Sequence, residues 1–195
     1  MQLLKDRIKA EGRILPGNIV KVDGFLNHRV DIKLMREMAK EFGRIFDTSD
    51  ITAVVTVEAS GIPLASICAD EFGVPLVFVK KAKSDNIEGG LYKSEIFSYT
   101  YRKKVTLILS QQWLGANDKV LIIDDFLANG EALRGLVDIV EQSGAELAGM
   151  GIAIEKGFQP GGAKLRERGV NLHSLAIIDA ADENGFVFRE DDYTL

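Results

Sequence analysis

Apolar residues recur along the chain with two different periods. After Asp31 they return every three or four positions as far as Phe46, with charged residues between them, which predicts an amphipathic helix capped by Asp31. Similar spacing predicts further helices at about 63–72 and 133–143. Short, nearly unbroken apolar runs predict strands at 53–57, 75–79, 120–123, 147–154 and 172–178. The alternation favours an α/β fold with a mostly parallel central sheet and flanking helices.

The strand predicted at 120–123 is followed by two adjacent carboxylates, Asp124 and Asp125. Because this strand is apolar on both faces, we expect it at the centre of the sheet, with the acidic pair where the strand leaves the sheet. Open α/β sheets bind ligands at that edge. An acidic pair alone is equally typical of a polar loop after a strand, so its meaning depends on the residues that come after it.

A turn of mostly small residues follows the acidic pair and leads into the helix that ends near Gly144. The turn contains Ala128, Asn129, Gly130, Glu131 and Ala132. The free N–H groups at a helix start attract anions, and small side chains let a phosphate approach them. Since carboxylates repel phosphate, we expect Asp124 and Asp125 to hold the hydroxyls of a ribose, or a Mg²⁺ ion that carries the ligand's charge. Together these features predict a sugar-phosphate site.

Between this site and the strand at 75–79, residues 80–105 lose both periods. The segment predicts a flexible hairpin at about 81–104, which is either an idle surface insertion or a lid that excludes water from a reacting sugar. Basic residues lie on both sides of its polar part: Lys80, Lys81 and Lys83 before it, and Arg102, Lys103 and Lys104 after it. A solvated surface cluster and a binding site for a second phosphate group are both open interpretations.

Composition limits the class of protein. The 195 residues, 46% of them hydrophobic, are typical of a single domain spanning 1–195 with its own core. No stretch reaches the roughly 20 apolar residues of a membrane span, and the start lacks a secretory signal, so we expect a cytoplasmic protein that does not bind membranes. The formal charge of −5 argues against nucleic acid as a partner. The single cysteine, Cys68, excludes an internal disulfide and is expected in the core.

The run from Val120 to Ala132 resembles the signature of the type I phosphoribosyltransferases that binds 5-phosphoribosyl 1-pyrophosphate (PRPP). Segments 13–28 and 155–158 resemble the bacterial members of this family that use xanthine, and the resemblance covers almost the whole chain. The commoner family loop has hydroxyl residues and two glycines, which this chain lacks. Backbone donors are therefore expected to carry more of the phosphate binding, and Glu131 to point away from the ligand.

The resemblance implies a purine-salvage transferase that makes a nucleoside monophosphate and pyrophosphate, with Mg²⁺ bound alongside PRPP. For the members that use xanthine the product is xanthosine 5'-monophosphate. Asp124 and Asp125 would be the catalytic carboxylates, and residues 128–132 the PRPP loop. The resemblance also implies the type I phosphoribosyltransferase fold, an N-terminal hood at about 1–35, and a homodimer.

The leaving pyrophosphate needs donors at the same edge of the sheet. The related adenine enzymes usually carry an arginine in the loop after the first strand, where this chain has Ser60. The backbone at Ser60, with Lys81 or Lys83, is therefore expected to receive the pyrophosphate. Tyr101 matches a tyrosine in the lid of the adenine enzymes, although an aromatic residue there could equally cover the core.

Recognition of the base is expected from the hood and from the strand at 147–154. By resemblance, Val20 and Asn27 belong to the hood over the base, although Asn27 could simply stabilise a turn. Lys156 follows its strand, and its ammonium could donate to a purine oxygen or N7, which favours an oxopurine over adenine. Phe158 could stack on the base or pack in the core.

Two rival functions remain open from the sequence. One is an adenine or a hypoxanthine/guanine phosphoribosyltransferase of the same fold. The other is a regulator that senses PRPP while it binds DNA or RNA. Only about fifty residues precede the first core strand, and because they match the hood they leave no room for a helix-turn-helix domain.

Overall fold

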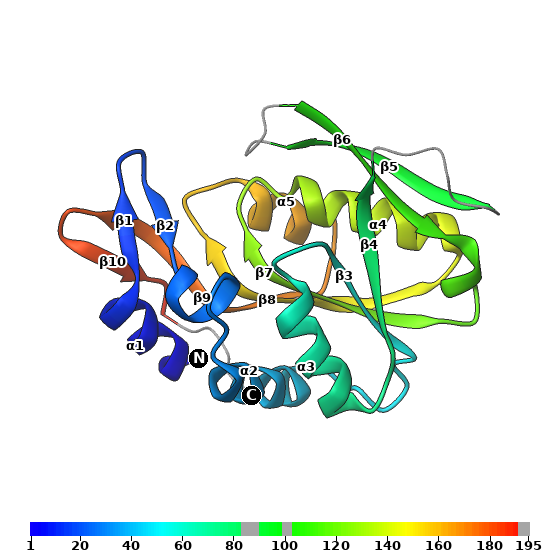
Figure 1. Ribbon diagram of the computed structural model, residues 1–195, viewed down its shortest axis with the longest axis horizontal. Coiled ribbons are helices and arrows are strands. Elements are labelled where there is room, and N and C mark those ends of the chain that lie inside the picture. Colours follow the sequence, from blue (N-terminus) through cyan, green and yellow to red (C-terminus); the bar gives the residue numbers. More distant parts are fainter. Residues whose placement is uncertain (83–89, 99–102, 191–195) are drawn as a thin grey trace.

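The computed structural model describes residues 1–82, 90–98 and 103–190. Within these ranges, five strands pair in parallel in the order β9-β8-β7-β3-β4, with antiparallel strands at both edges (Figure 1). The strands of this sheet are β3 (Ala53–Val57), β4 (Leu76–Ala82), β5 (Leu91–Ser98), β6 (Lys103–Ser110), β7 (Lys119–Leu127), β8 (Glu146–Lys156), β9 (Leu172–Asp182) and β10 (Gly185–Phe188). The α/β fold with a mostly parallel sheet is confirmed.

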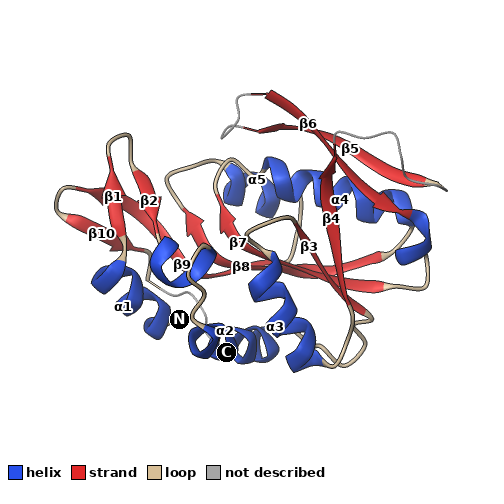
Figure 2. Ribbon diagram, viewed as in Figure 1, coloured by secondary structure: helices blue, strands red, loops and turns tan. Residues whose placement is uncertain are grey.

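Helices cover both faces of the sheet, as Figure 2 shows. The α-helices are α1 (Gln2–Glu11), α2 (Ile32–Ile45), α3 (Ile62–Phe72), α4 (Glu131–Ser143) and α5 (Gly161–Glu167). In the view of Figure 1, α2 and α3 lie below the sheet, and α4 and α5 lie above it. Asp31 caps α2 by accepting hydrogen bonds from the N–H groups of Lys33 and Leu34, as predicted. None of the described helices is both long and apolar enough to cross a membrane.

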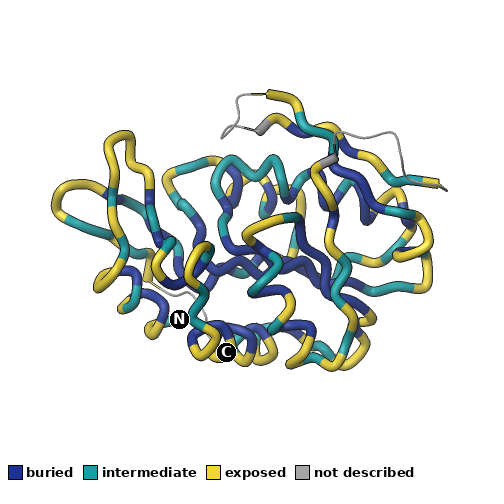
Figure 3. The backbone as a smooth tube through the Cα atoms, in the orientation of Figure 1, coloured by how far each residue is buried: buried dark blue, intermediate teal, exposed yellow. Residues whose placement is uncertain are grey.

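The two faces of the sheet bury two separate apolar clusters. Along β7, Leu121 and Ile123 pack into the cluster between the sheet and helices α2 and α3. Val120 and Ile122 pack into the cluster between the sheet and α4. All four side chains are fully buried, and Figure 3 shows the central strands as the most buried part of the backbone. This arrangement explains why the run at 120–123 has no polar alternation.

Several predicted boundaries were wrong. β7 continues to Leu127, so Asp124 and Asp125 lie inside the strand and not beyond its end. The parallel ladder with β8 holds the strand together this far, since Leu127 still pairs with Glu155. β4 and β8 likewise extend to Ala82 and Lys156, and Lys156 is therefore the last residue of its strand.

Several elements were not predicted, among them α1, α5 and β10. α5 is seven residues long and begins with two glycines, which are poor helix formers, and β10 is a four-residue strand paired antiparallel with β9. α1, the hairpin of β1 (Arg13–Leu15) and β2 (Ile19–Lys21), and the short π-helix η1 (Asp23–Asn27) lie where the hood was expected. The division into hood, core and lid stays a prediction.

A hairpin is present as β5 and β6, which extend the sheet beyond β4, but the predicted bounds of 81–104 were wrong: residues 81 and 82 belong to β4, and the paired strands run from Leu91 to Ser110. Its strands pack against α4: the Ser94 hydroxyl donates to Asp138 at 2.7 Å, and the Arg134 guanidinium donates to the Glu95 carbonyl at 2.7 Å. Lys83, Tyr101 and Arg102 lie outside the described residues. The role of the hairpin as a lid stays a prediction.

Candidate functional site

Three segments that are distant in sequence meet at the acidic pair. Asp124 and Asp125 are 4% and 5% exposed. The Ser60 hydroxyl, in the loop between β3 and α3, donates to Asp125 Oδ1 at 3.0 Å. The Asn27 side-chain amide, at the end of η1, donates to Asp125 Oδ2 at 3.2 Å. η1 and the loop between β3 and α3 therefore hold the Asp125 carboxylate from two sides.

The two carboxylates differ in their surroundings. Asp124 accepts a hydrogen bond from the N–H of Asp125 at 2.9 Å. Burial, and then the negative charge of Asp125, raise the pKa of Asp124 well above its usual value, and the positive charge of Lys81 opposes the shift. A ligand that brings a cation or hydroxyl donors to this carboxyl would stabilise its ionised form. The pair is thus suited to a polyhydroxylated or metal-carrying ligand.

The loop between β3 and α3 approaches the acidic pair closely. A Cβ atom added at Gly61 would overlap Asp124 Oδ1 and Thr56 Oγ1, so only glycine fits there without movement. Thr56 Oγ1 is one of the buried polar atoms for which the described residues provide no hydrogen-bond partner. The peptide between Glu58 and Ala59 in this loop is cis.

The end of β4 lies beside the same loop. The Lys81 N–H donates to the Glu58 carboxylate at 2.6 Å. Since β3 and β4 are parallel, their carboxyl ends share one edge of the sheet, which brings Ser60 and Lys81 to the side where Asp124 lies. The topology therefore brings Ser60 and Lys81 to one edge of the sheet, as expected. Whether they bind pyrophosphate stays a prediction.

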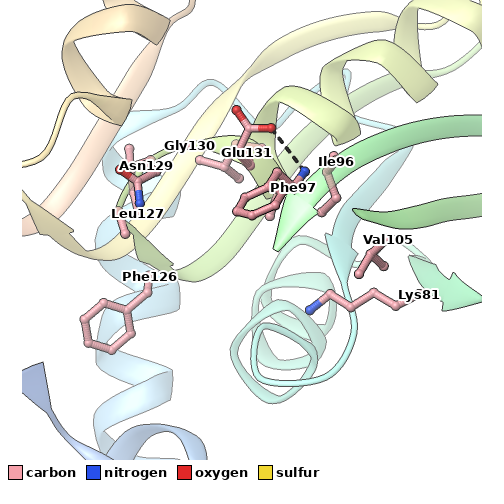
Figure 4. A pocket seen from close by; sticks show the side chains of 12 residues that line it. Lys81, Ile96, Phe97, Val105, Phe126, Leu127, Asn129, Gly130 and Glu131 are labelled. Atoms are coloured by element: carbon pink, nitrogen blue, oxygen red, sulfur yellow. Dashed lines mark hydrogen bonds between the residues drawn. The ribbon is translucent and has the colours of Figure 1, made fainter. Parts of the chain in front are cut away.

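The small-residue turn forms one wall of a cavity of about 190 Å³ (Figure 4). Lys81 and Phe97 also line this cavity. Gly130 has φ +84°, in the left-handed region that favours glycine, and it is the residue before α4. The first N–H groups of a helix have no partner within the helix, so the turn presents donors at the cavity. This geometry suits an anion.

Glu131 is the awkward residue of this turn, because its charge opposes anion binding. Its carboxylate accepts a hydrogen bond from the Phe97 N–H at 3.4 Å (Figure 4) and another from Arg134 at 3.3 Å. The side chain is thus directed toward β5 and the first turn of α4, and the guanidinium of Arg134 compensates its charge. The expectation that Glu131 points away from a bound ligand stays a prediction.

A second group of residues lies at the ends of β7 and β8. The Lys156 ammonium is 5.7 Å from the centroid of the Phe126 ring, within the range of a cation–π contact. Lys156 is half-buried, and burial lowers its pKa. Phe126 was missed in the sequence. Strict alternation from Ile122 would have placed Phe126 on the α4 face of the sheet, whereas it packs against the cluster on the α2 and α3 face, so the local pattern gave no signal for it.

The remaining predicted base contacts are less closely gathered. Val20, in β2, is 7% exposed and packs in the cluster beneath α2 and α3. Phe158, two residues beyond β8, is 39% exposed, so it is not a core residue. Asn27 faces Asp125 and thereby links the hood to the acidic pair. Their roles in base binding stay predictions, and Tyr101 lies outside the part of the chain that the structure describes.

Comparison with known sequences identifies the family of the chain. A model of the phosphoribosyl transferase domain matches residues 23–168, which include every element from η1 to α5. Two proteins named xanthine phosphoribosyltransferase are similar over nearly their full lengths. The protein from Lachnoclostridium phytofermentans is 54% identical, covering 98% of this chain and 100% of its own. The protein from Ruminiclostridium cellulolyticum is 51% identical, covering 97% and 100%.

Solved structures show the same fold at lower identity. The adenine phosphoribosyltransferase of Giardia lamblia, complexed with 9-deazaadenine, has a TM-score of 0.75 and 25% identity, covering 89% of this chain and 96% of its own. The enzyme of Saccharomyces cerevisiae has a TM-score of 0.73 and 21% identity, covering 90% and 99%. The fold is therefore shared with adenine enzymes, while the greater sequence similarity is to proteins with a different name.

Proposed function

The chain belongs to the phosphoribosyl transferase family, and we propose that it is a purine-salvage enzyme that converts xanthine and PRPP to xanthosine 5'-monophosphate and pyrophosphate. One observation carries the choice of base. The relatives named for xanthine are 54% and 51% identical to the chain over almost all of it, whereas the adenine enzymes of the same fold share 21–25%.

The base is assigned to the space beside Lys156 and Phe126. Xanthine presents carbonyl oxygens and acidic ring N–H groups, and a half-buried ammonium stabilises both an oxygen acceptor and partial negative charge. Adenine carries an amino group where xanthine has an oxygen, so it would set a donor against the Lys156 donor. The Phe126 ring adds an apolar surface on which a purine can stack. Val20 and Asn27 would complete the site from the hood.

The ribose of PRPP is assigned to Asp124 and Asp125. The displacement of pyrophosphate by a purine nitrogen passes through a transition state with positive charge on the sugar, which nearby carboxylates stabilise. Ser60 and Asn27 hold the Asp125 carboxylate from both sides, so its orientation is fixed before the substrate binds. The ribose hydroxyls would donate to oxygens that burial keeps poorly solvated.

The two phosphoryl ends of PRPP are assigned to different loops. The 5'-phosphate would bind the main-chain N–H groups of residues 128–132, where the turn lines the cavity. The pyrophosphate would bind the backbone around Ser60 and the Lys81 ammonium, at the ends of β3 and β4. The acidic pair lies between these loops, so one extended sugar phosphate can reach all three.

Mg²⁺ fits this arrangement as a partner of the substrate. Among the described residues, no group of three acidic, histidine or cysteine side chains is placed to hold a metal unaided. Mg²⁺ commonly takes one or two carboxylates together with substrate phosphates, and Asp124 or Asp125 would supply them. When bound, the ion neutralises charge on the leaving pyrophosphate.

The proposal also takes the enzyme to be a cytoplasmic homodimer, as the resemblance and the composition suggest. Light scattering coupled to size-exclusion chromatography measures this directly. A mass of twice one chain at micromolar concentration supports the dimer, and a mass of one chain at all concentrations rejects it.

Initial rates with PRPP, Mg²⁺ and each of four purines test the function. We expect xanthine to give the highest kcat/KM, followed by guanine or hypoxanthine, with adenine the poorest. The product should co-elute with xanthosine 5'-monophosphate, and pyrophosphate should appear in equal amount. Preference for adenine, or absence of turnover with every purine, would reject the proposal.

A further inference from the structure

An ion pair between a buried carboxylate and a partly exposed guanidinium lies behind the site, on the face of β8 opposite Lys156. Glu155 is 2% exposed, and its two oxygens accept hydrogen bonds from the Arg166 guanidinium of α5 at 2.8 and 2.7 Å. The Ser174 hydroxyl of β9 donates to the same carboxylate at 2.6 Å. Successive residues of a strand point to opposite faces, so Glu155 faces α5 while Lys156 faces the proposed base site.

Such a pair is weak evidence for stability, because the cost of removing the Glu155 carboxylate from water offsets much of the attraction. What the pair does provide is a fixed geometry. The fork of an arginine on a carboxylate sets both distance and orientation. The first turn of α5 leaves no room for adjustment, since a Cβ added at Gly162 would overlap Glu155 Oε1. The pair therefore sets where α5 lies against the sheet.

The start of α5 in turn touches the small-residue turn. The Gly161 N–H donates to the Ala128 carbonyl at 3.1 Å. A Cβ added at Gly161 would overlap that carbonyl, and one added at Gly130 would lie 3.1 Å from the Gly161 Cα atom. The backbones of α5 and of the turn thus meet through glycines. The first residue of α5 contacts residues 128–130, and Arg166, near its other end, pairs with Glu155 of the sheet. Any shift of α5 is passed directly to the turn.

We propose that Glu155 and Arg166 are positioning residues for the PRPP loop, acting through the backbone contact between α5 and residues 128–130. This inference rests on the proposed function, in which that loop binds the 5'-phosphate. It assigns the pair to the affinity for PRPP and not to the recognition of the base, although Glu155 adjoins Lys156 in the chain.

The test compares Arg166→Met with Arg166→Lys. The first removes the guanidinium and keeps a long apolar chain, and the second keeps one charged hydrogen bond to Glu155. We expect Arg166→Met to raise the KM for PRPP about tenfold and to change the KM for xanthine less than about twofold. Arg166→Lys should recover most of the PRPP affinity, which a residue that only filled space would not require.

The matched control is Lys119→Met. Lys119 pairs with Asp50 at 2.8 Å and with Glu146 at 3.1 Å, at the opposite ends of β7 and β8 from the site. This variant removes two ion pairs, but because they lie far from the site it should leave both KM values unchanged. An equal rise in both KM values for Arg166→Met, an unchanged PRPP KM, or the same PRPP effect in the control would overturn the inference.

Hydrogen exchange followed by mass spectrometry gives a readout that needs no turnover. Amides at 128–134 should exchange faster in Arg166→Met than in the wild type, and at the same rate in Lys119→Met. If the wild type fails to use xanthine, the proposed function falls, while this comparison still decides whether the pair holds the turn. If Arg166→Met does not fold, Ser174→Ala removes only one bond to Glu155 and should show the same exchange change at smaller size; an unchanged rate would count against the inference.

Discussion

Replacing Lys156 with methionine isolates the role of one charge in the choice of base. Methionine keeps a long unbranched chain and can retain the apolar contact with the Phe126 ring, from which the ammonium lies 5.7 Å away. The substitution therefore removes the ammonium and its hydrogen bonds with little change in packing. Any loss that depends on the purine can then be assigned to the charge.

The expected size follows from the position of the side chain. A hydrogen bond to a charged group contributes about 1.5–3 kcal/mol, which corresponds to about 10- to 160-fold in kcat/KM. Because Lys156 is only half-buried, water competes for the ammonium, and we expect the lower part of this range, about 10- to 40-fold for xanthine. Adenine, which has no oxygen to accept the bond, should lose nothing.

The assay is kcat/KM for xanthine, guanine, hypoxanthine and adenine with saturating PRPP and Mg²⁺. Guanine and hypoxanthine share one carbonyl with xanthine, so their losses show which oxygen Lys156 contacts. A loss confined to xanthine indicates the carbonyl that the other two lack. Equal losses for all four purines, or an unchanged ratio of xanthine to adenine, would refute the assignment of Lys156 to a purine oxygen.

The pH dependence supplies a second check on the same residue. Lysine is charged below its pKa, and burial places the pKa of Lys156 below its usual 10.5. The kcat/KM for xanthine should therefore fall on the alkaline side as pH rises through the lowered pKa. The methionine variant controls for ionisation of xanthine itself. If the fall is the same in both proteins, it does not come from Lys156.

Three further predictions concern other parts of the chain. Asp124→Asn and Asp125→Asn should each lower kcat about a hundredfold or more, and a turnover near that of the wild type would contradict the catalytic role. The melting temperature of Asp124→Asn should stay the same or rise, because burial already disfavours the charge of this carboxylate. Cys68 is fully buried and burial raises its pKa, so a maleimide should label it only after denaturation, as mass spectrometry will show. Burial raises the pKa of Glu155, but the hydrogen bonds from Arg166 and Ser174 outweigh burial and hold this pKa below its usual 4.5. The stabilisation that the ionised Glu155 contributes is therefore fully present above pH 4.5 and is lost as the pH falls through the lowered pKa of the folded protein. Urea unfolding at stepwise lower pH should show this loss in the wild type and not in Arg166→Met.

The elements that the sequence predicted correctly are those with strong local signals. Mainly apolar runs at β3, β7 and β9 identify strands buried on both faces, and the spacing in α2 and α4 identifies helices. The acidic pair and the small-residue turn stand out because polar residues interrupt such a run. Strand ends were less predictable, since Asp124 and Asp125 stay in β7 only through pairing with β8. That pairing is a property of the fold and not of the local residues.

The contacts around the site could not be predicted because they join distant residues. Asn27 and Ser60 meet at Asp125 from separations of 98 and 65 residues. Arg166 lies in a short stretch of alternating charges that is typical of a solvated surface, and its partner Glu155 lies in a strand eleven residues away. Only the packing of α5 against β8 brings them together. The two glycines that begin α5 are poor helix formers, so the sequence did not predict this helix. The same glycines allow α5 to lie close to the turn and to Glu155.

The composition of the turn at 128–132 and the ion pair behind it are connected by one physical requirement. A loop rich in hydroxyl side chains can adjust its contacts to a phosphate through rotation of those side chains. The turn at 128–132 has none, so its donors are main-chain N–H groups, whose directions depend on the backbone alone. A backbone site is only as well oriented as the structure that supports it. In this chain α5 touches the turn at Ala128, and Arg166 fixes α5 to the sheet. Because the turn lacks hydroxyl donors, phosphate binding there depends more on a rigid backbone. The ion pair between Glu155 and Arg166 supplies that rigidity through α5.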